Sequence, residues 1–221
     1  MDNRVMDYKG KGRLIVFEGV DGAGKTTMIK NVVKALEKRN IFPFLFRGPG
    51  GTSFGENVRD AIFKSGTEPC NLAVALAMMA SHVQVFNEKA VPMVEDGSVI
   101  ILDRFMESTM SYQGHDDSVK NIVKELIKMT VPSDFPVITF VIDIPIEVAL
   151  ERLSSRGVEN FFDSKAVEFY TGIRTRLLGR MAELKEDGQQ IHVVNNNVSF
   201  EDSLATAEFI AEQIETSLFQ K

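Results

Sequence analysis

Short apolar runs alternate with longer segments of helical period along most of the chain. The short runs have the length of buried strands and lie at residues 14–17, 42–46, 99–102, 137–142 and 191–194. Helix-like spacing of apolar residues is found at residues 28–38, 72–85, 119–129 and 201–218. Because strands and helices alternate, we expect an α/β fold with a five-stranded parallel sheet, right-handed crossovers and helices on both faces. Ligands of such a sheet gather at the carboxyl ends of its strands.

Local signals mark one further helix after the fourth apolar run. Pro145 has the φ angle of a first helical turn, Asp143 precedes it and Glu147 favours the positive end of the helix dipole. Gly157 follows the last turn of the pattern. We therefore predict a helix that begins near Pro145 and ends just before Gly157.

Length and charge limit the classes of function. With 221 residues, 44% hydrophobic and 25% charged, the chain is long enough to bury the core of one α/β domain. The net charge of -6 argues against a nucleic acid polymer as partner, because neutralising many phosphates needs a broad excess of Lys and Arg. A mononucleotide needs only a local basic pocket.

The first residues of the chain, its hydropathy and its single cysteine indicate where in the cell the protein resides. Residues 1–12 are polar and lack the apolar segment of a signal peptide, so we interpret them as a flexible leader before one domain at residues 13–221. No apolar run approaches the length of a membrane span, and we expect no membrane partner. Cys70 cannot form an internal disulfide and is compatible with a reducing cytoplasm, where we expect the protein to reside.

The most informative motif directly follows the first apolar run. It fits the pattern G-x-x-x-x-G-K-S/T and comprises Gly19, Val20, Asp21, Gly22, Ala23, Gly24, Lys25, Thr26 and Thr27. A predicted strand precedes it and a predicted helix follows it, which is the order of a phosphate-binding loop. Its glycines allow backbone N–H groups to turn toward phosphate oxygens, and the positive end of the helix points at the same place. We therefore expect all nine residues to bind ATP.

The polar side chains of this motif have separate tasks in a nucleotide site. Lys25 adds a positive charge beside the phosphates, and Thr26 offers a hydroxyl to the Mg²⁺ that accompanies a nucleoside triphosphate. The alternative is a glycine-rich turn that only connects a strand to a helix, and the motif together with its flanking patterns favours the phosphate-binding loop over it.

Further segments along the chain carry a resemblance to a family. After the loop come Arg47 with the segment Pro49-Gly50-Gly51-Thr52, then Asp103-Arg104-Phe105, then Ser108-Thr109 and Tyr112-Gln113-Gly114. In this order they resemble the thymidylate kinases, and the resemblance covers most of the chain. It implies the three-layer sandwich of P-loop NTPases with a mobile lid, and assembly into a homodimer.

The activity implied by the resemblance is transfer of the γ-phosphoryl group of ATP to dTMP, which yields dTDP for DNA precursor synthesis. Catalysis of this kind depends on positioning and charge neutralisation. The resemblance assigns Mg²⁺ to Thr26 and Asp103, and the transfer to Lys25, Asp21 and Arg104. A guanidinium binds phosphate through two parallel hydrogen bonds, so Arg104 suits the acceptor phosphate better than a lysine would. A surface ion pair is the alternative role for Asp103 and Arg104.

The same resemblance implies a site for the acceptor nucleotide. Its residues come from the phosphate loop, the end of the second strand and two later segments: Asp21, Arg47, Met78, His82, Arg104, Ser108, Thr109, Tyr112 and Gln113. Asp21 would meet the sugar 3′-hydroxyl, Tyr112 would pack on deoxyribose and Thr109 would contact the pyrimidine N3 edge.

The positions of arginines separate two variants of this family. One variant has a catalytic arginine in the phosphate loop, and the other has basic residues in the lid. The loop here has none, whereas Arg152 and Arg156 lie four residues apart on the helix that enters a lid at about residues 157–164. We therefore expect both to act on the triphosphate, although an ordinary solvated helix end would carry them too.

Three departures from the family pattern concern the acceptor site. Gly48 stands where the family has Glu, and Met78 and His82 stand where it has an aromatic ring and an arginine. Four residues apart on one helix, Met78 and His82 should face the same pocket. A larger pocket would suit a pyrimidine extended at C5, such as 5-hydroxymethyl-dUMP, which is an alternative acceptor to dTMP.

A different class of function also stays open, as does the role of one apolar segment. The chain could be a catalytically silent nucleotide-binding module, because fold alone does not decide function. A GTPase is disfavoured, since its Asn-Lys-x-Asp motif is replaced by Asn195-Asn196-Asn197. The unusually apolar segment 72–85 could be a dimer interface or could be covered by the helices predicted at 119–129 and 201–218.

Overall fold

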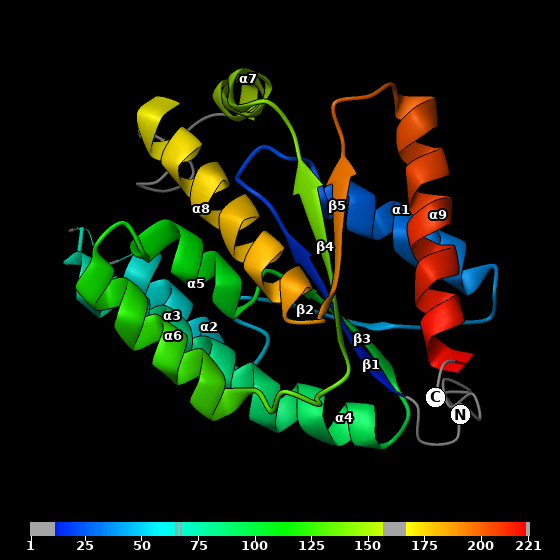
Figure 1. Cartoon of the computed structure of the whole chain (residues 1–221), viewed down its shortest axis with the longest axis horizontal. Coiled ribbons are helices and arrows are strands. Elements are labelled where there is room, and N and C mark those ends of the chain that lie inside the picture. Colours follow the sequence, from blue (N-terminus) through cyan, green and yellow to red (C-terminus); the bar gives the residue numbers. More distant parts are fainter. Residues whose placement is uncertain (1–11, 65, 67, 157–166, 220–221) are drawn as a thin grey trace.

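The computed structural model describes residues 12–64, 66, 68–156 and 167–219 (Figure 1). Its centre is a five-stranded parallel sheet in the order β2-β3-β1-β4-β5. The strands are β1 Arg13–Glu18, β2 Phe44–Arg47, β3 Val99–Asp103, β4 Val137–Asp143 and β5 Gln190–Asn195. The predicted α/β fold and its parallel sheet are therefore confirmed.

Helices cover both faces of the sheet and make the fold three layers thick (Figure 1). Those on one face are α1 Lys25–Glu37 and α9 Phe200–Phe219. The other side carries α2 Ser53–Phe63, α3 Asn71–Val85, a short π-helix Phe86–Ala90, α4 Val91–Glu95, α5 Met106–Gln113, α6 Asp117–Thr130 and α8 Val167–Glu186. The remaining helix, α7 Ile146–Arg156, lies near the carboxyl end of β4.

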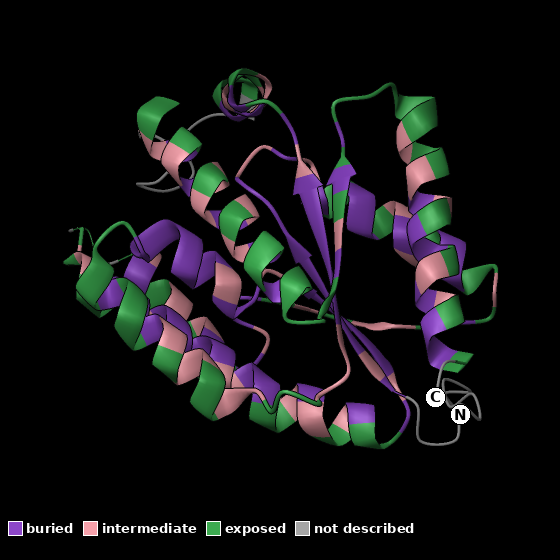
Figure 2. Ribbon diagram, in the orientation of Figure 1, coloured by how far each residue is buried: buried purple, intermediate pink, exposed green. Residues whose placement is uncertain are grey.

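The central strands bury alternate side chains against different helices. Ile15 and Phe17 of β1 join the core formed with α1 and α9, whereas Leu14 and Val16 pack with α3, α5 and α6. Figure 2 shows this buried sheet between helices whose outer faces are exposed. Burial on both faces explains why these strands are apolar at successive positions.

The edge strands differ from the predicted two-sided burial. β2 begins two residues later than expected and ends at Arg47, and Leu45 on it is exposed. Val193 of the opposite edge strand, β5, is exposed as well. The expected sheet with helices on both faces is present, but the buried apolar character predicted for residues 42–46 and 191–194 holds only in part, because the helices cover mainly the middle of the sheet.

The order of the strands brings distant loops to one place. Since β1 lies between β3 and β4, the residues after β1 and after β3 meet at the same edge of the sheet. Helix α7 is confirmed where the boundary signals predicted it. Asp143, however, is the last residue of β4, and its carboxylate binds Arg174 of α8 instead of capping α7.

Two expectations concern the limits of the domain. Gly12, the last residue of the predicted leader, is buried against Val94 and packs with the domain, whereas residues 1–11 lie outside the described part of the chain. The predicted lid at 157–164 also lies outside the described residues. Among the helices that are described, none combines the length and the apolar character needed to cross a membrane.

Candidate active site

The phosphate loop is shaped by glycines that other residues could not replace. Gly22 and Gly24 have φ angles of +80° and +89°. A Cβ on Gly22 would lie 2.3 Å from the carbonyl oxygen of Ala149 in α7, and one on Gly24 would lie 2.6 Å from Nδ2 of Asn196. The loop is thus packed between α7 and the segment after β5, and α1 begins directly after it at Lys25.

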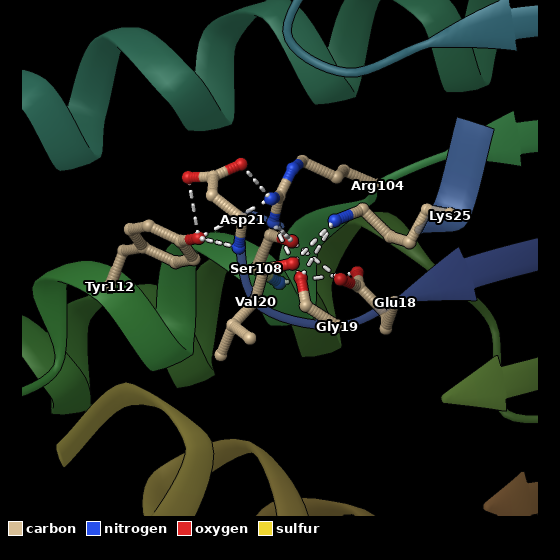
Figure 3. Close-up of polar contacts among 8 residues, drawn as sticks. All are labelled: Glu18, Gly19, Val20, Asp21, Lys25, Arg104, Ser108 and Tyr112. Carbon is tan, nitrogen blue, oxygen red and sulfur yellow. Dashed lines mark hydrogen bonds and ion pairs between the residues drawn. The ribbon is translucent and has the colours of Figure 1, made fainter. Parts of the chain in front are cut away.

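Lys25 lies inside the curve of this loop (Figure 3). Its Nζ donates to the carbonyl oxygens of Gly19 at 3.0 Å and Val20 at 2.9 Å. Burial, together with the nearby charge of Arg104, lowers the pKa of Lys25 to about 8. The ammonium group is therefore held where loop backbone and phosphate oxygens would compete for it.

Arg104, Asp21 and Tyr112 form one hydrogen-bonded group beside the loop (Figure 3). Arg104 binds the carboxylate of Asp21 and lies 3.3 Å from the Tyr112 hydroxyl, which donates to Asp21 at 2.8 Å. The same guanidinium donates to the carbonyl oxygen of Gly19 at 3.0 Å. Although burial opposes it, the charges of Arg104 and Lys25 lower the pKa of Asp21 to about 2, so this carboxylate is ionised at neutral pH.

The backbone at Arg104 is itself unusual. Its φ of +71° lies in the left-handed region that non-glycine residues rarely adopt. Its N–H donates to the carbonyl oxygen of Phe17 at 2.9 Å, and its side chain makes the bonds described above. Such a conformation persists only where the surroundings hold it, which is typical of functional sites.

Glu18, the last residue of β1, binds the segment that directly follows Arg104. Its carboxylate accepts hydrogen bonds from the backbone N–H groups of Phe105 and Ser108, at 2.9 Å and 3.2 Å, and from the Ser108 hydroxyl. It thereby satisfies the N–H of Phe105 at the start of α5 and shares the N–H of Ser108 with the carbonyl oxygen of Phe105. Complete burial raises the pKa of Glu18 to about 6 despite these bonds. Our sequence reasoning missed this role, because β1 and α5 are far apart in the chain.

Thr26 and Asp103 line one hollow at the carboxyl edge of the sheet, together with Arg47 and Glu56. Oδ1 of Asp103 is buried and has no hydrogen-bond partner among the described residues. An unpartnered carboxylate oxygen near a hydroxyl fits a hard cation such as Mg²⁺, which takes one or two protein ligands and completes its shell with phosphate and water. No cluster of three or more His, Cys, Asp or Glu suited to a metal occurs in the described part of the chain.

A separate cavity lies between α2, α3 and α5. It brings together most of the predicted acceptor residues: Asp21, Met78, His82, Arg104, Ser108, Thr109, Tyr112 and Gln113. Arg47 is the exception, because it lines the hollow with Asp103 and its guanidinium binds Glu56 at 2.7 Å.

Arg59 and Phe63 of α2 also line this cavity, and our sequence reasoning missed both. The guanidinium of Arg59 lies over the Phe63 ring, 4.9 Å from its centroid. Thr52 caps α2 by accepting from the backbone N–H of Gly55, and residues four apart share a helix face. A capping signal at Thr52 could therefore have revealed the helix and this pair.

The other loop residues have different surroundings. The side chains of Val20 and Ala23 are buried in the core, so these residues can offer a ligand only their backbone. Thr26 and Thr27 are exposed at the start of α1.

Comparison with known proteins decides the family. The family model described as thymidylate kinase matches residues 17–206. The chain belongs to the thymidylate kinase family. Proteins named thymidylate kinase from Carboxydothermus hydrogenoformans and Rickettsia typhi are 32% and 35% identical to it over 169 residues. These matches cover 76% of this chain and 83% and 82% of the two relatives. The chain is accordingly a nucleoside monophosphate kinase.

Gly48 and His82, two of the three departures from the thymidylate kinase pattern, pack against each other. A Cβ on Gly48 would lie 2.4 Å from Cε1 of His82 and 2.6 Å from the carbonyl oxygen of Arg104. Real Cβ atoms do not approach other atoms so closely, so the buried imidazole occupies the space that a side chain at position 48 would need. The glutamate of the family pattern and this placement of His82 exclude each other.

Of the two arginines predicted to act with the lid, only Arg152 has a described side chain. Nη1 of Arg152 lies 3.5 Å from the position that a Cβ on Gly24 would take, so α7 carries this guanidinium to the phosphate loop. The side chain of Arg156 lies outside the described residues. Asn196, from the loop where a GTPase would have its base-binding motif, donates from Nδ2 to the carbonyl oxygen of Ala23 at 2.8 Å. It thus contacts the phosphate loop itself.

Proposed function

We propose that this thymidylate kinase family member transfers the γ-phosphoryl group of ATP to dTMP, giving dTDP and ADP for DNA precursor synthesis. One observation carries the proposal. The guanidinium of Arg104 binds the carbonyl oxygen of Gly19 in the phosphate loop and also the Asp21 and Tyr112 side chains that wall the acceptor cavity. Arg104 therefore fixes the position of the phosphate loop relative to the acceptor cavity. Positioning of the two substrates is the main requirement of phosphoryl transfer.

The donor nucleotide would bind through the loop backbone and Lys25. The loop N–H groups and the positive end of α1 attract phosphate oxygens. Lys25 would exchange its bonds to Gly19 and Val20 for the β- and γ-phosphates. Thr26 and Asp103 would hold Mg²⁺, which when bound offsets negative charge on the triphosphate.

The acceptor nucleotide would place its phosphate beside Arg59 and Arg104, and Arg47 would reach that phosphate by giving up its bond to Glu56. An oxygen of that phosphate attacks the γ-phosphorus, the bond to the bridging oxygen breaks, and ADP leaves with the electron pair. The attacking oxygen is already ionised, so no general base is needed. Asp21, with a pKa of about 2, acts by orienting Arg104 and Tyr112 and holds no proton.

Further parts of the proposal concern the lid, assembly and compartment. Arg152 and Arg156 would neutralise charge on the transferring group when the lid closes. Exposed apolar residues on α3 and α6 support a homodimer, and we assign the enzyme to the cytoplasm, where ATP is available.

A coupled assay of ADP release tests this function. With ATP and Mg²⁺, we expect turnover of dTMP to exceed that of 5-hydroxymethyl-dUMP and dGMP. Lys25→Met should lower kcat by about 10²–10³-fold, the effect of losing one donor to the transition state. The matched control is Lys34→Met, at an exposed position of the same helix. Binding of ATP without turnover of any acceptor would instead support the silent nucleotide-binding module, and faster turnover of 5-hydroxymethyl-dUMP would favour the modified acceptor.

A further inference from the structure

The inner part of the acceptor cavity contains buried polar atoms that the protein does not satisfy. Nδ1 of His82, on α3, and Oγ1 of Thr109, on α5, have no hydrogen-bond partner among the described residues. The two residues are 1% and 2% exposed, and both line the cavity. Leaving a buried polar atom unpaired is costly, so these atoms indicate bonds that a ligand completes.

His82 presents a neutral ring to that ligand. Burial, together with the charge of Arg104, lowers the pKa of His82 to about 3. Within the described part of the chain, the charged side chains that line the cavity with it are Arg104, Asp21 and Arg59, the last of which donates to the carbonyl oxygen of Pro49. A neutral imidazole carries one donor and one acceptor nitrogen and can exchange them by changing tautomer.

The ring is also fixed in place. Gly48 lies against one side of the His82 ring, where a Cβ would be 2.4 Å from Cε1, and the Phe105 ring meets the imidazole edge-on with centroids 5.7 Å apart. The imidazole therefore adapts to a ligand by moving a proton, while its position stays the same.

The neighbouring polar groups can likewise both donate and accept hydrogen bonds. The Thr109 hydroxyl both donates and accepts, and so does the amide of Gln113, which is 2% exposed in the same cavity. Ser108 differs, because its hydroxyl is already committed to Glu18 and Arg104.

The chemistry of a pyrimidine nucleotide decides what these groups meet. With the phosphate among the arginines, the base extends away from its N1 atom, and C4 is the ring atom opposite N1. The inner groups therefore meet the C4 substituent and N3. Thymine presents an acceptor at C4 and a donor at N3, and cytosine presents the reverse.

We infer that this acceptor site serves 4-amino as well as 4-oxo pyrimidine deoxynucleoside monophosphates, and so phosphorylates dCMP-type acceptors besides dTMP. The inference rests on the proposed function, because it extends the acceptors of the same site. Fixed donors would favour one base, whereas His82, Thr109 and Gln113 can reverse their hydrogen bonds. The reaction is unchanged: the acceptor phosphate oxygen bonds to the γ-phosphorus and ADP leaves.

The sharpest test compares dTMP with 5-methyl-dCMP, which differ only in the C4 substituent and N3. We expect their kcat/KM values to agree within about tenfold, whereas a site with fixed hydrogen-bonding groups discriminates by about 10⁴–10⁵. A preference for dTMP clearly above about tenfold would overturn the inference and leave the proposed function standing. Absence of turnover with either acceptor would refute the proposed function itself.

Variants of His82 separate recognition from structural damage. His82→Gln keeps a group that donates and accepts, so the ratio of the two kcat/KM values should stay near that of the wild type. His82→Lys offers donors only and should shift the ratio by about tenfold or more, toward dTMP if position 82 meets the C4 substituent and toward 5-methyl-dCMP if it meets N3. Structural damage affects both acceptors alike and leaves the ratio unchanged. An unchanged ratio in His82→Lys would therefore contradict the inference.

Discussion

Single residues carry the connection between the sheet and the site. Glu18 ends β1, and its carboxylate accepts from the N–H groups of Phe105 and Ser108 at the start of α5. Because Arg104 directly precedes Phe105, this carboxylate also fixes where the arginine leaves the strand. The position of Arg104, which we propose binds the acceptor phosphate, thus depends on Glu18, a residue that need not touch a substrate.

Removing the Glu18 carboxylate should destabilise the fold. Glu18→Ala leaves the backbone N–H of Phe105 and the buried Ser108 hydroxyl without their carboxylate acceptor, whereas the Ser108 N–H keeps its bond to the carbonyl oxygen of Phe105. We expect a cost of about 3 kcal/mol in the free energy of unfolding. Glu18→Gln keeps one oxygen that can accept from these groups and should cost clearly less. Urea denaturation of the three proteins at pH 7.5 measures both values, and equal losses in the two variants would show that the bonds to α5 contribute little.

The raised pKa of Glu18 predicts that the free energy of unfolding depends on pH. Since the pKa of Glu18 is about 6 in the folded state against 4.5 when unfolded, the folded protein binds more protons between these values. Stability from this group is therefore lost as pH rises through that window, by about 2 kcal/mol in all. Glu18→Gln lacks the effect, so its stability relative to the wild type should improve by about that amount from pH 4 to pH 7.5. A constant difference across this range would disprove the shifted pKa.

Arg104 offers a third prediction at this scale. Arg104→Lys cannot contact Gly19, Asp21 and Tyr112 at once, because an ammonium lacks the planar fork of the guanidinium. We expect kcat/KM for dTMP to fall by about 10²–10³-fold with little change in melting temperature. Arg180→Lys is the control, since Arg180 of α8 pairs with Glu107 and lines neither nucleotide hollow. Similar losses in both variants would indicate a general structural effect.

At the scale of elements, the phosphate loop is held by segments that follow it far along the chain. Helix α7 packs Ala149 against Gly22, and the segment after β5 brings Asn196 to Ala23 and Gly24. Asn196 is buried, and its own N–H donates to the carbonyl oxygen of Asp143 at the end of β4. The loop is therefore preorganised by the elements around it.

This support predicts an effect on ATP binding. Asn196→Ala removes the bond to the carbonyl oxygen of Ala23 and leaves a space beside Gly24, so we expect the Kd for ATP to rise about tenfold, the equivalent of one hydrogen bond. Calorimetric titration with ATP measures the change. Asn195→Ala is a matched control, because Asn195 is exposed and its side chain accepts from the N–H of Asn197, outside the phosphate loop. If both variants bind ATP as the wild type does, Asn196 does not support the loop.

At the scale of the whole molecule, the helix α3 has more apolar surface than the described chain covers. It packs against α2, α5 and α6, in line with the expected cover by the helix at 119–129, while α9 packs against α1. Leu72 and Leu76 of α3 nevertheless remain exposed, as do Ile122 and Met129 of α6. A second copy of the chain would cover such a surface.

Sedimentation analysis over a range of concentrations tests the dimer. We expect the wild type to sediment as a dimer and Leu76→Glu to shift it toward monomer, because an interface would bury the new charge. Phe209→Glu provides the control, since Phe209 of α9 is 50% exposed and Leu76 is 47% exposed. A monomeric wild type at all concentrations would reject the dimer.

The sequence alone determined the features that depend on contiguous residues. The phosphate loop was predictable because its glycines, Lys25 and Thr26 form one continuous motif between a strand and a helix. Met78 and His82 were correctly placed on one cavity because helical spacing brings residues four apart to one face. The parallel sheet followed from alternating patterns, although exposure of the edge strands did not.

Tertiary structure alone decided which distant residues complete the site. The bond from Asn196 to Ala23 spans 173 positions and that from Ser108 to Glu18 spans 90, and no local spacing encodes such pairs. Likewise, Gly48 looked like a missing carboxylate, and only the packed structure shows it making room for His82. The physical reason is that periodicity reports which face of an element is apolar, whereas contacts between elements depend on strand order and close packing.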